Sequence, residues 1–259
     1  MITKINDYND LLNKISEFKR NTSSKLTNFF PNKALHENWI KQNNFYYKEE
    51  NNLLFIFHEK ESHYETFYIA EDLNSVIRQL KILKKSFQKP FVLEHVYKER
   101  KDLPISLPTA KLKKMVKKIS SLAEEPNNDI DKASLSDIPI LTNIFTNYFN
   151  RFTERIPDED ELKNLIQSES VSVIRTEDSI KGFIIYEVKG KSSHLRYWWI
   201  NPRYRNQGIG SKLIKDFFKA SKNCLMLYLW VFSDNEDAIN KYLHYGFDFD
   251  GMTDDIYLI

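Results

Sequence analysis

The stretch RNQGIGSK, residues 205–212, combines residue types that suit the binding of an anion. Gly208 and Gly210 stand one residue apart just before an apolar-periodic run, and Arg205 and Lys212 add positive charge. A glycine loop that opens a helix presents several backbone N–H groups together, and such groups bind phosphates. We expect side chains at positions 208 and 210 to block the close approach of a pyrophosphate. The alternative is a loop that uses glycine only to turn.

Two common phosphate-binding loops do not fit this stretch. A Walker loop needs Gly-Lys followed by Ser or Thr at a set spacing, and none follows here. A dinucleotide fingerprint needs a third glycine where Leu213 stands. All six glycines of the chain fall in its second half, at positions 182, 190, 208, 210, 246 and 251. We therefore expect no comparable loop in the first half.

The second half alternates between predicted helices and strands. Apolar spacing and capping residues predict helices over residues 133–149, 157–168, 211–220 and 236–246. Residues 170–176, 181–188, 194–200, 224–232 and 254–259 have the composition of strands. The glycine loop therefore lies between a strand and an amphipathic helix.

At these residues the chain resembles a known family. The stretch INPRYRNQGIGSKLI is similar to motif A of the GNAT acyltransferases, with Arg205, Gly208 and Gly210 in the motif positions. The stretch SDNEDAINKYLHYGFDF resembles the next conserved block, with Asn235 and Tyr242 at the usual spacing. The order of elements from about residue 128 onward is also similar. This resemblance implies a mixed, mostly antiparallel sheet flanked by helices.

The resemblance also implies where a donor substrate binds. Motif A amides would hold the pyrophosphate of acetyl-coenzyme A, and the preceding strand would pair through its backbone with the pantetheine arm. Asn235, in the following block, would add a side-chain contact with the donor. The implied binding residues are Trp198, Trp199, Ile200, Arg205, Asn206, Gln207, Gly208, Ile209, Gly210, Ser211 and Asn235.

Acyl transfer to an amine also needs groups that move protons. The amine loses a proton, the tetrahedral intermediate needs a hydrogen-bond donor, and the departing thiolate must be protonated. By the resemblance, Tyr242 lies near the thioester sulfur, and we expect it to act on the thiolate rather than only to pack. His194 stands where many family members carry a glutamate base, and Glu187 or an ordered water is the alternative.

Other candidate residues have simpler interpretations. Cys224 is the only cysteine, which excludes an internal disulfide and a cysteine-based zinc site, and we expect it to be a buried small hydrophobe. We expect no bound metal. Trp198 and Trp199 should point to opposite faces of their strand. The residues that can shape an acceptor pocket or belong to the core are Tyr148, Phe149, Arg151 and Phe152.

The first half has its own predicted elements. Residues 51–70 have the pattern of a strand hairpin, residues 72–87 that of a helix with Val76, Leu80, Leu83 and Phe87 on one face, and residues 89–99 that of a strand. This order repeats the second half without its glycine loop. We interpret residues 1–103 as an α+β accessory domain, either a degenerate GNAT-like copy in a tandem architecture or an unrelated fold.

Between the halves, residues 104–128 are expected to form a linker with a lysine-rich helix, and residues 129–259 the acetyltransferase domain. The segment KLKKMVKKI places Leu112, Met115, Val116 and Ile119 on one helical stripe, which we expect to pack on a neighbouring domain rather than on a membrane or nucleic acid.

The composition bounds the remaining expectations. The net charge of +2 indicates no particular partner, and no apolar run approaches the ~20 residues of a membrane span. We expect a cytoplasmic N-acetyltransferase that transfers an acetyl group from acetyl-coenzyme A to a primary amine of a small molecule or protein. The alternative is a non-catalytic module that binds acyl-coenzyme A or a protein. The sequence names neither the acceptor nor the oligomeric state.

Overall fold

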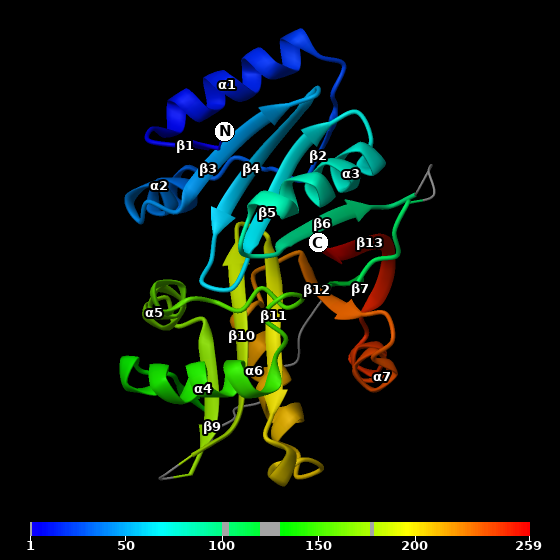
Figure 1. The fold of residues 1–259 in the computed structure, drawn as a ribbon. Helices are drawn as coiled ribbons and strands as arrows, with labels where there is room; N and C mark the ends of the chain where they lie inside the picture. The colour runs from blue at the N-terminus through cyan, green and yellow to red at the C-terminus, as the bar shows by residue number, and fades with distance from the viewer. Residues whose placement is uncertain (1, 100–103, 120–129, 177–178) are drawn as a thin grey trace. The chain divides into compact units, whose positions relative to one another are not determined.

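A computed structural model (Figure 1) describes residues 2–99, 104–119, 130–176 and 179–259. The chain divides into two compact units. Unit 1 comprises Met1–Lys111 together with Met252–Ile259, and unit 2 comprises Leu112–Gly251. Within the described ranges, none of the helices combines the length and the apolar character that crossing a membrane requires.

Unit 1 is a sheet with helices on both faces. Its strands follow the order β1-β3-β4-β5-β6-β13, in which β5 and β6 are parallel and the other neighbours antiparallel. Its elements are β1 (Thr3–Lys4), α1 (Tyr8–Asn21), β2 (Leu26–Thr27), α2 (Lys33–Lys41), β3 (Phe45–Glu50), β4 (Leu53–Glu59), β5 (Tyr64–Ala70), α3 (Leu73–Leu83), β6 (Phe91–Tyr97) and most of β13 (Asp248–Leu258).

Unit 2 has the same arrangement. Its strands follow the order β8-β9-β10-β11-β12-β7, in which β11 and β12 are parallel and the other neighbours antiparallel. Its elements are β7 (Ala110–Lys118), β8 (Asp131–Lys132), α4 (Ile138–Tyr148), α5 (Glu159–Gln167), β9 (Val171–Arg175), β10 (Ile180–Lys189), β11 (Ser192–Ile200), α6 (Ile209–Ala220), β12 (Met226–Phe232) and α7 (Glu236–His244). The mixed, mostly antiparallel sheet flanked by helices is thus confirmed.

The two faces of the unit 2 sheet carry different helices. Leu141 and Phe145 of α4, with Leu162 of α5, pack in one core cluster. Leu213 and Phe217 of α6 pack in the other, and both are fully buried. These α6 residues recur at helical spacing, so burial of one apolar stripe stabilises the helix that follows the glycine loop.

The closing strand of each sheet comes from a distant part of the chain. In unit 1, Thr253–Leu258 of β13 pair with β6, although they follow unit 2 in sequence. In unit 2, Leu112–Lys118 of β7 pair with β12, although they follow β6 in sequence. Unit 1 therefore needs a strand that follows unit 2 in sequence, whereas β7 begins the continuous segment that forms unit 2.

The expected helix in the lysine-rich segment was wrong. Ala110–Lys118 form strand β7, in which Met115 is completely buried while Lys113 and Lys118 are exposed. Antiparallel pairing of Met115 with Leu229 places the methionine in the α6 core. Pairing with β12 outweighs the local helical pattern. Residues 120–128 of the predicted linker lie outside the described residues.

This strand assignment predicts a large difference between two substitutions in β7. Met115→Ala removes a fully buried side chain and should lower the free energy of unfolding by about 2–5 kcal/mol. Lys113→Ala changes an exposed side chain on the same strand and should alter it by less than about 0.5 kcal/mol. Urea unfolding followed by circular dichroism measures both, and equal costs would contradict the assignment.

Candidate functional site

Strands β11 and β12 are paired over only part of their length. The parallel register runs from Ser192 opposite Met226 to Leu195 opposite Leu229. Beyond this point β11 continues to Ile200 and β12 to Phe232. In the part of the chain that the structure describes, no strand pairs with this edge of β11 after Leu195. Because backbone N–H and C=O groups need partners, the edge suits a ligand that carries amide groups.

The other edge of β11 stays paired with β10, and this pairing decides which backbone groups face the gap. The Asn201 N–H donates to the Lys181 carbonyl at 2.9 Å. Antiparallel alternation then directs the backbone groups of Trp199 toward β10 and those of Trp198 and Ile200 toward the open edge. Of the three strand residues predicted to pair with pantetheine, Trp198 and Ile200 have the required orientation.

A β-bulge marks the point where the two strands separate. Ile185 lies opposite Tyr197 and Tyr186 lies opposite Leu195, which leaves Arg196 as an extra residue in β11. The bulge shifts the alternation of side chains. Trp199 then packs with the α4 and α5 core, and Trp198 packs against the α6 core. The expectation that the two tryptophans face opposite sides of the sheet is confirmed.

The loop before α6 leaves its amides accessible. Gly208 adopts φ +76° at the N-cap position, and no atom lies within 4 Å of the place where its Cβ would stand. Among the described residues, no acceptor is recorded for the backbone N–H groups of residues 206–211. Residues 205–208 are exposed. The N-terminus of α6 thus combines N–H groups that have no acceptor among the described residues with an exposed loop, as anion binding requires.

Gly210 also allows close packing within the protein. A Cβ at this position would lie 3.1 Å from Cζ2 of Trp198, closer than ordinary contact. The missing side chain therefore lets the indole of Trp198 pack on the first turn of α6. This packing is one reason for a glycine at position 210, and the open surroundings of Gly208 leave room for a ligand.

Tyr242 on α7 lies beside the residue that lines the gap. Its ring centroid is 5.7 Å from that of Trp198 and 5.9 Å from that of Phe247. No hydrogen bond of its hydroxyl is recorded among the described residues. Burial raises the pKa of Tyr242, so the phenol keeps its proton at neutral pH. A protonated, unengaged phenol beside the gap is suited to donate a proton.

Two further contacts fix α7 near the loop. The Tyr245 hydroxyl donates to Ser211 Oγ at 2.9 Å, which joins α7 to the first turn of α6. Asn235 caps α7, because its Oδ1 accepts the Ala238 N–H at 3.1 Å. This cap is a local structural role for Asn235, and its predicted contact with the donor substrate stays a prediction.

His194 lies on the α5 side of the sheet in a stack with Tyr228. The ring centroids are 4.5 Å apart and the planes differ by 6°. Burial, together with the nearby cations Arg196 and Lys189, lowers the pKa of His194 to about 3. The imidazole is therefore neutral at physiological pH. With this low pKa it is a weak base and would not hold a proton near neutral pH. Glu187 lies opposite His194 in the register of β10 and β11.

The bulge residue anchors the neighbouring helix. Arg196 Nη1 donates to Glu161 Oε1 of α5 at 2.6 Å and lies 3.6 Å from Glu187 Oε2. The next residue, Tyr197, donates its hydroxyl to the carbonyls of Glu154 and Arg155 in the α4–α5 loop, at 3.0 and 2.5 Å. The loop between α4 and α5, which carries residues that can shape an acceptor pocket or belong to the core, is thereby tied to the bulge. Sequence reasoning missed these roles, because a bulge has no local signature here.

The aromatic residues of that loop are divided between core and surface. Phe149 packs against the α4 and α5 core, whereas the Tyr148 side chain is exposed and its ring lies 5.1 Å from that of Trp199.

Cys224 is buried, as expected, and burial raises the pKa of its thiol. Within the described ranges, no group of three or more His, Cys, Asp or Glu side chains is placed to hold a metal ion.

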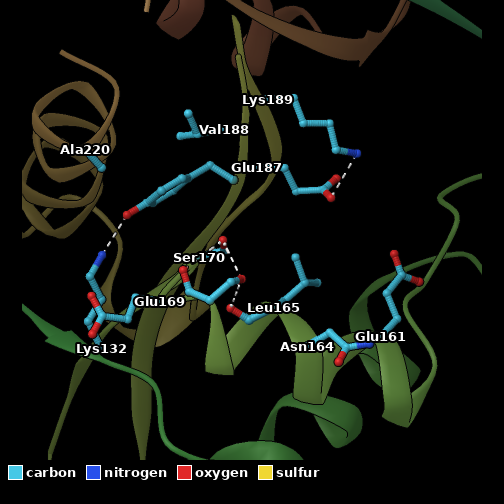
Figure 2. A pocket seen from close by; sticks show the side chains of 12 residues that line it. Lys132, Glu161, Asn164, Leu165, Glu169, Ser170, Glu187, Val188, Lys189 and Ala220 are labelled. Carbon is cyan, nitrogen blue, oxygen red and sulfur yellow. Dashed lines mark hydrogen bonds and ion pairs between the residues drawn. The ribbon is translucent and has the colours of Figure 1, made fainter. Parts of the chain in front are cut away.

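A polar pocket of about 650 Å³ lies elsewhere in unit 2, where β10 extends past the start of β9 (Figure 2). Lys132 Nζ donates to the Tyr186 hydroxyl at 2.6 Å, and Lys189 lies 3.2 Å from Glu187. These charged and polar groups thus have partners within the pocket. None of the glycine-loop residues lines it, whereas Glu187, an alternative to His194 as the base, does.

Comparison with known proteins agrees with this geometry. Residues 138–247 match the family described as Acetyltransferase (GNAT) family. The chain is similar to spermine/spermidine N(1)-acetyltransferase of Bacillus subtilis (strain 168), with 30% identity over 89 residues. That match covers 30% of this chain and 59% of the relative, so the chain spans less than two thirds of the relative's length.

Solved structures resemble the fold. A GCN5-related N-acetyltransferase from Sphaerobacter thermophilus has 11% identity and a TM-score of 0.56, over 80% of this chain and 76% of that one. A GNAT-family acetyltransferase from Colwellia psychrerythraea has 14% identity and a TM-score of 0.50, over 99% of both chains. The latter likeness extends over both units, consistent with a tandem GNAT architecture.

The lowered pKa of His194 predicts a loss of stability in acid. An unfolded histidine with a pKa near 6.5 takes up a proton as the pH falls, whereas the folded His194 stays neutral until about pH 3. The contribution of His194 to stability is therefore present above pH 6.5 and is lost as the pH falls toward 3. The urea midpoint of unfolding should be lower at pH 4.5 than at pH 7, and this decrease should be smaller in His194→Gln than in the wild type.

His244→Gln serves as the control, because it changes an exposed histidine of the same unit. This variant should keep the wild-type dependence on pH. Identical midpoint changes in His194→Gln and wild type would show that the environment of His194 does not suppress its protonation.

Proposed function

We propose, from the premise that residues 138–247 form a domain of the Acetyltransferase (GNAT) family, that the chain is an N-acetyltransferase. It transfers an acetyl group from acetyl-coenzyme A to a primary amine of a small molecule or protein. One observation carries the proposal. The open edge of β11 leads to the bare N-terminus of α6, so a strand-like ligand that ends in a pyrophosphate fits both features.

Two parts of unit 2 bind different parts of the donor: the loop before α6 and the open edge of β11. The amides of residues 206–211 receive the pyrophosphate, with Arg205 adding positive charge. The backbone groups of Trp198 and Ile200 receive the amide groups of the pantetheine arm. The thioester supplies an activated acetyl group, and its position beside the bulge is set by these contacts.

Tyr242 provides the proton for the leaving group. As the amine attacks the carbonyl carbon, a C–N bond forms, and the C–S bond then breaks to release a thiolate. The phenol gives its proton to that sulfur as the thiolate develops, and the phenolate that remains takes up a proton again before the next turnover. The contact of Tyr242 with Trp198 supports this role, because it places the ring next to the strand that binds the donor.

The proton of the amine leaves by another route. His194 has a pKa of about 3 and would hold such a proton poorly, so we favour Glu187, directly or through water, over His194 as acceptor. Glu187 is held by Arg196 and Lys189, which fix its place on the α5 side of β11. His194 then acts as a neutral ring that packs on Tyr228.

The acceptor is best sought among amines of several sizes. The printed name of the Bacillus subtilis relative makes spermidine and spermine suitable first members of a panel. Simple alkyl amines, amino acids and a lysine peptide complete it. Acetyl transfer is followed by the release of free thiol from acetyl-coenzyme A. Donor binding without turnover on the whole panel would favour a non-catalytic module.

Two glycines allow a matched test of donor binding. Gly208 and Gly190 both have positive φ, +76° and +59°, and at neither position does an atom lie within 4 Å of the place that a Cβ would take. Alanine at either position should therefore cost the same ~1–2 kcal/mol of folding free energy. Only Gly208→Ala should weaken the binding of acetyl-coenzyme A, by about tenfold or more in Kd. Gly208→Trp should abolish binding.

Isothermal titration calorimetry measures these affinities, and circular dichroism checks folding. Equal affinity in Gly208→Ala and Gly190→Ala would remove the basis for placing the pyrophosphate at this loop.

Removal of one hydroxyl tests the role of Tyr242. Tyr242→Phe should lower turnover by roughly 10²–10⁴, the range of a general acid, because the ring still packs on Trp198 but no proton is available. The Kd for acetyl-coenzyme A should stay within about twofold of the wild type. Steady-state kinetics with the best amine of the panel gives the result. Full turnover in this variant would assign Tyr242 to packing alone.

A further inference from the structure

Unit 1 repeats the divergence of parallel strands seen in unit 2. Strands β5 and β6 pair only from Tyr64 opposite Phe91 to Thr66 opposite Leu93. Beyond this point β5 continues to Ala70 and β6 to Tyr97. The same geometry in unit 2 produces the open edge to which we assign the donor. Unit 1 therefore contains the framework of a second groove.

In unit 1 this groove is filled by the chain itself. Strand β2 pairs antiparallel with the diverging part of β5, with Leu26 opposite Ala70 and Thr27 opposite Ile69. The Thr27 hydroxyl also donates to the Tyr68 carbonyl at 2.6 Å. The backbone edge that remains open in unit 2 is thus occupied by β2 in unit 1.

Asn28 spans the gap between the two strands. Its Nδ2 donates to the carbonyl of Thr66 on β5 at 3.1 Å and to that of Glu94 on β6 at 2.9 Å. Its Oδ1 accepts the N–H of Tyr68 at 2.8 Å. One side-chain amide therefore satisfies backbone groups of both diverging strands. This is the hydrogen bonding that an amide of a pantetheine arm would otherwise supply.

The helix that follows β5 is also closed to an anion. Only Glu71 and Asp72 separate β5 from α3, so there is no loop comparable with residues 201–208 of unit 2. The Asp72 carboxylate caps α3 by accepting the Ser75 N–H at 2.8 Å and the Ser75 hydroxyl at 2.6 Å. A carboxylate at the helix N-terminus repels a phosphate.

We propose that unit 1 is a copy of the donor-binding fold that is closed by its own residues 24–29, the plug segment, so that each chain binds one acetyl-coenzyme A, in unit 2. The proposal rests on the proposed function, because it takes the donor site of unit 2 as its reference. The plug segment is held at its end by Phe29, which is buried and stacks on His36 at 4.8 Å. The closure is therefore part of the unit 1 core.

Hydrogen exchange on the full chain tests where the donor binds. Saturating acetyl-coenzyme A should slow exchange within residues 196–211 and leave residues 64–70 and 93–97 unchanged. Titration calorimetry should give one site per chain. Slowed exchange within residues 64–70, or two sites per chain, would overturn the proposal. Binding to neither unit would instead overturn the proposed function, and the variant described next would still decide whether the segment closes the groove.

The variant Asn28→Ala tests the closure without any ligand. It leaves the backbone groups of Thr66, Tyr68 and Glu94 without their partner, so exchange within residues 67–70 should rise by roughly tenfold. Asn9→Ala is the control, because Asn9 is an exposed asparagine of α1 in the same unit. It should leave exchange in β5 unchanged. Equal exchange rates in both variants would show that the plug segment does not protect this edge.

Discussion

The early end of the parallel pairing between β11 and β12 is the feature on which the rest of the site depends. Both strands continue past Leu195 and Leu229, so one edge of β11 keeps its hydrogen-bonding groups without a neighbouring strand. The Arg196 bulge lies at this point, turns Trp198 toward α6, and directs the ion pairs of Arg196 toward α5. The proposed donor-binding edge and the contacts to α5 thus meet at one place in one strand.

Comparison of the two units shows how little change closes such a groove. Both sheets have the same strand order and the same divergence, and in both the last strand pairs with a strand far from it in sequence. In unit 2 a glycine loop precedes the helix and the edge stays open. In unit 1 Asp72 caps the helix and Asn28 joins the strands. The two units therefore differ in a few polar residues and one loop, while the arrangement of their sheet strands is the same.

Local patterns were sufficient to predict the glycine loop, the stripe of α6 and the unit 1 hairpin, because each depends on neighbouring residues. They failed for Ala110–Lys118, whose apolar residues recur at helical spacing, because pairing with β12 decides the outcome. The packing of Trp198 on Gly210 and the cap by Asn235 were also missed. The first depends on a contact between distant residues, and the second on the side-chain orientation at a helix start.

The central claim is that the donor binds against the loop before α6, and the low glycine content of the chain allows a direct measurement. A sample labelled with ¹⁵N-glycine contains only six labelled backbone amides, at Gly182, Gly190, Gly208, Gly210, Gly246 and Gly251. On titration with acetyl-coenzyme A, we predict that the amide signals of Gly208 and Gly210 shift strongly while that of Gly190, in the turn between β10 and β11, stays in place. Saturable binding that leaves the Gly208 and Gly210 signals unmoved would contradict the claim.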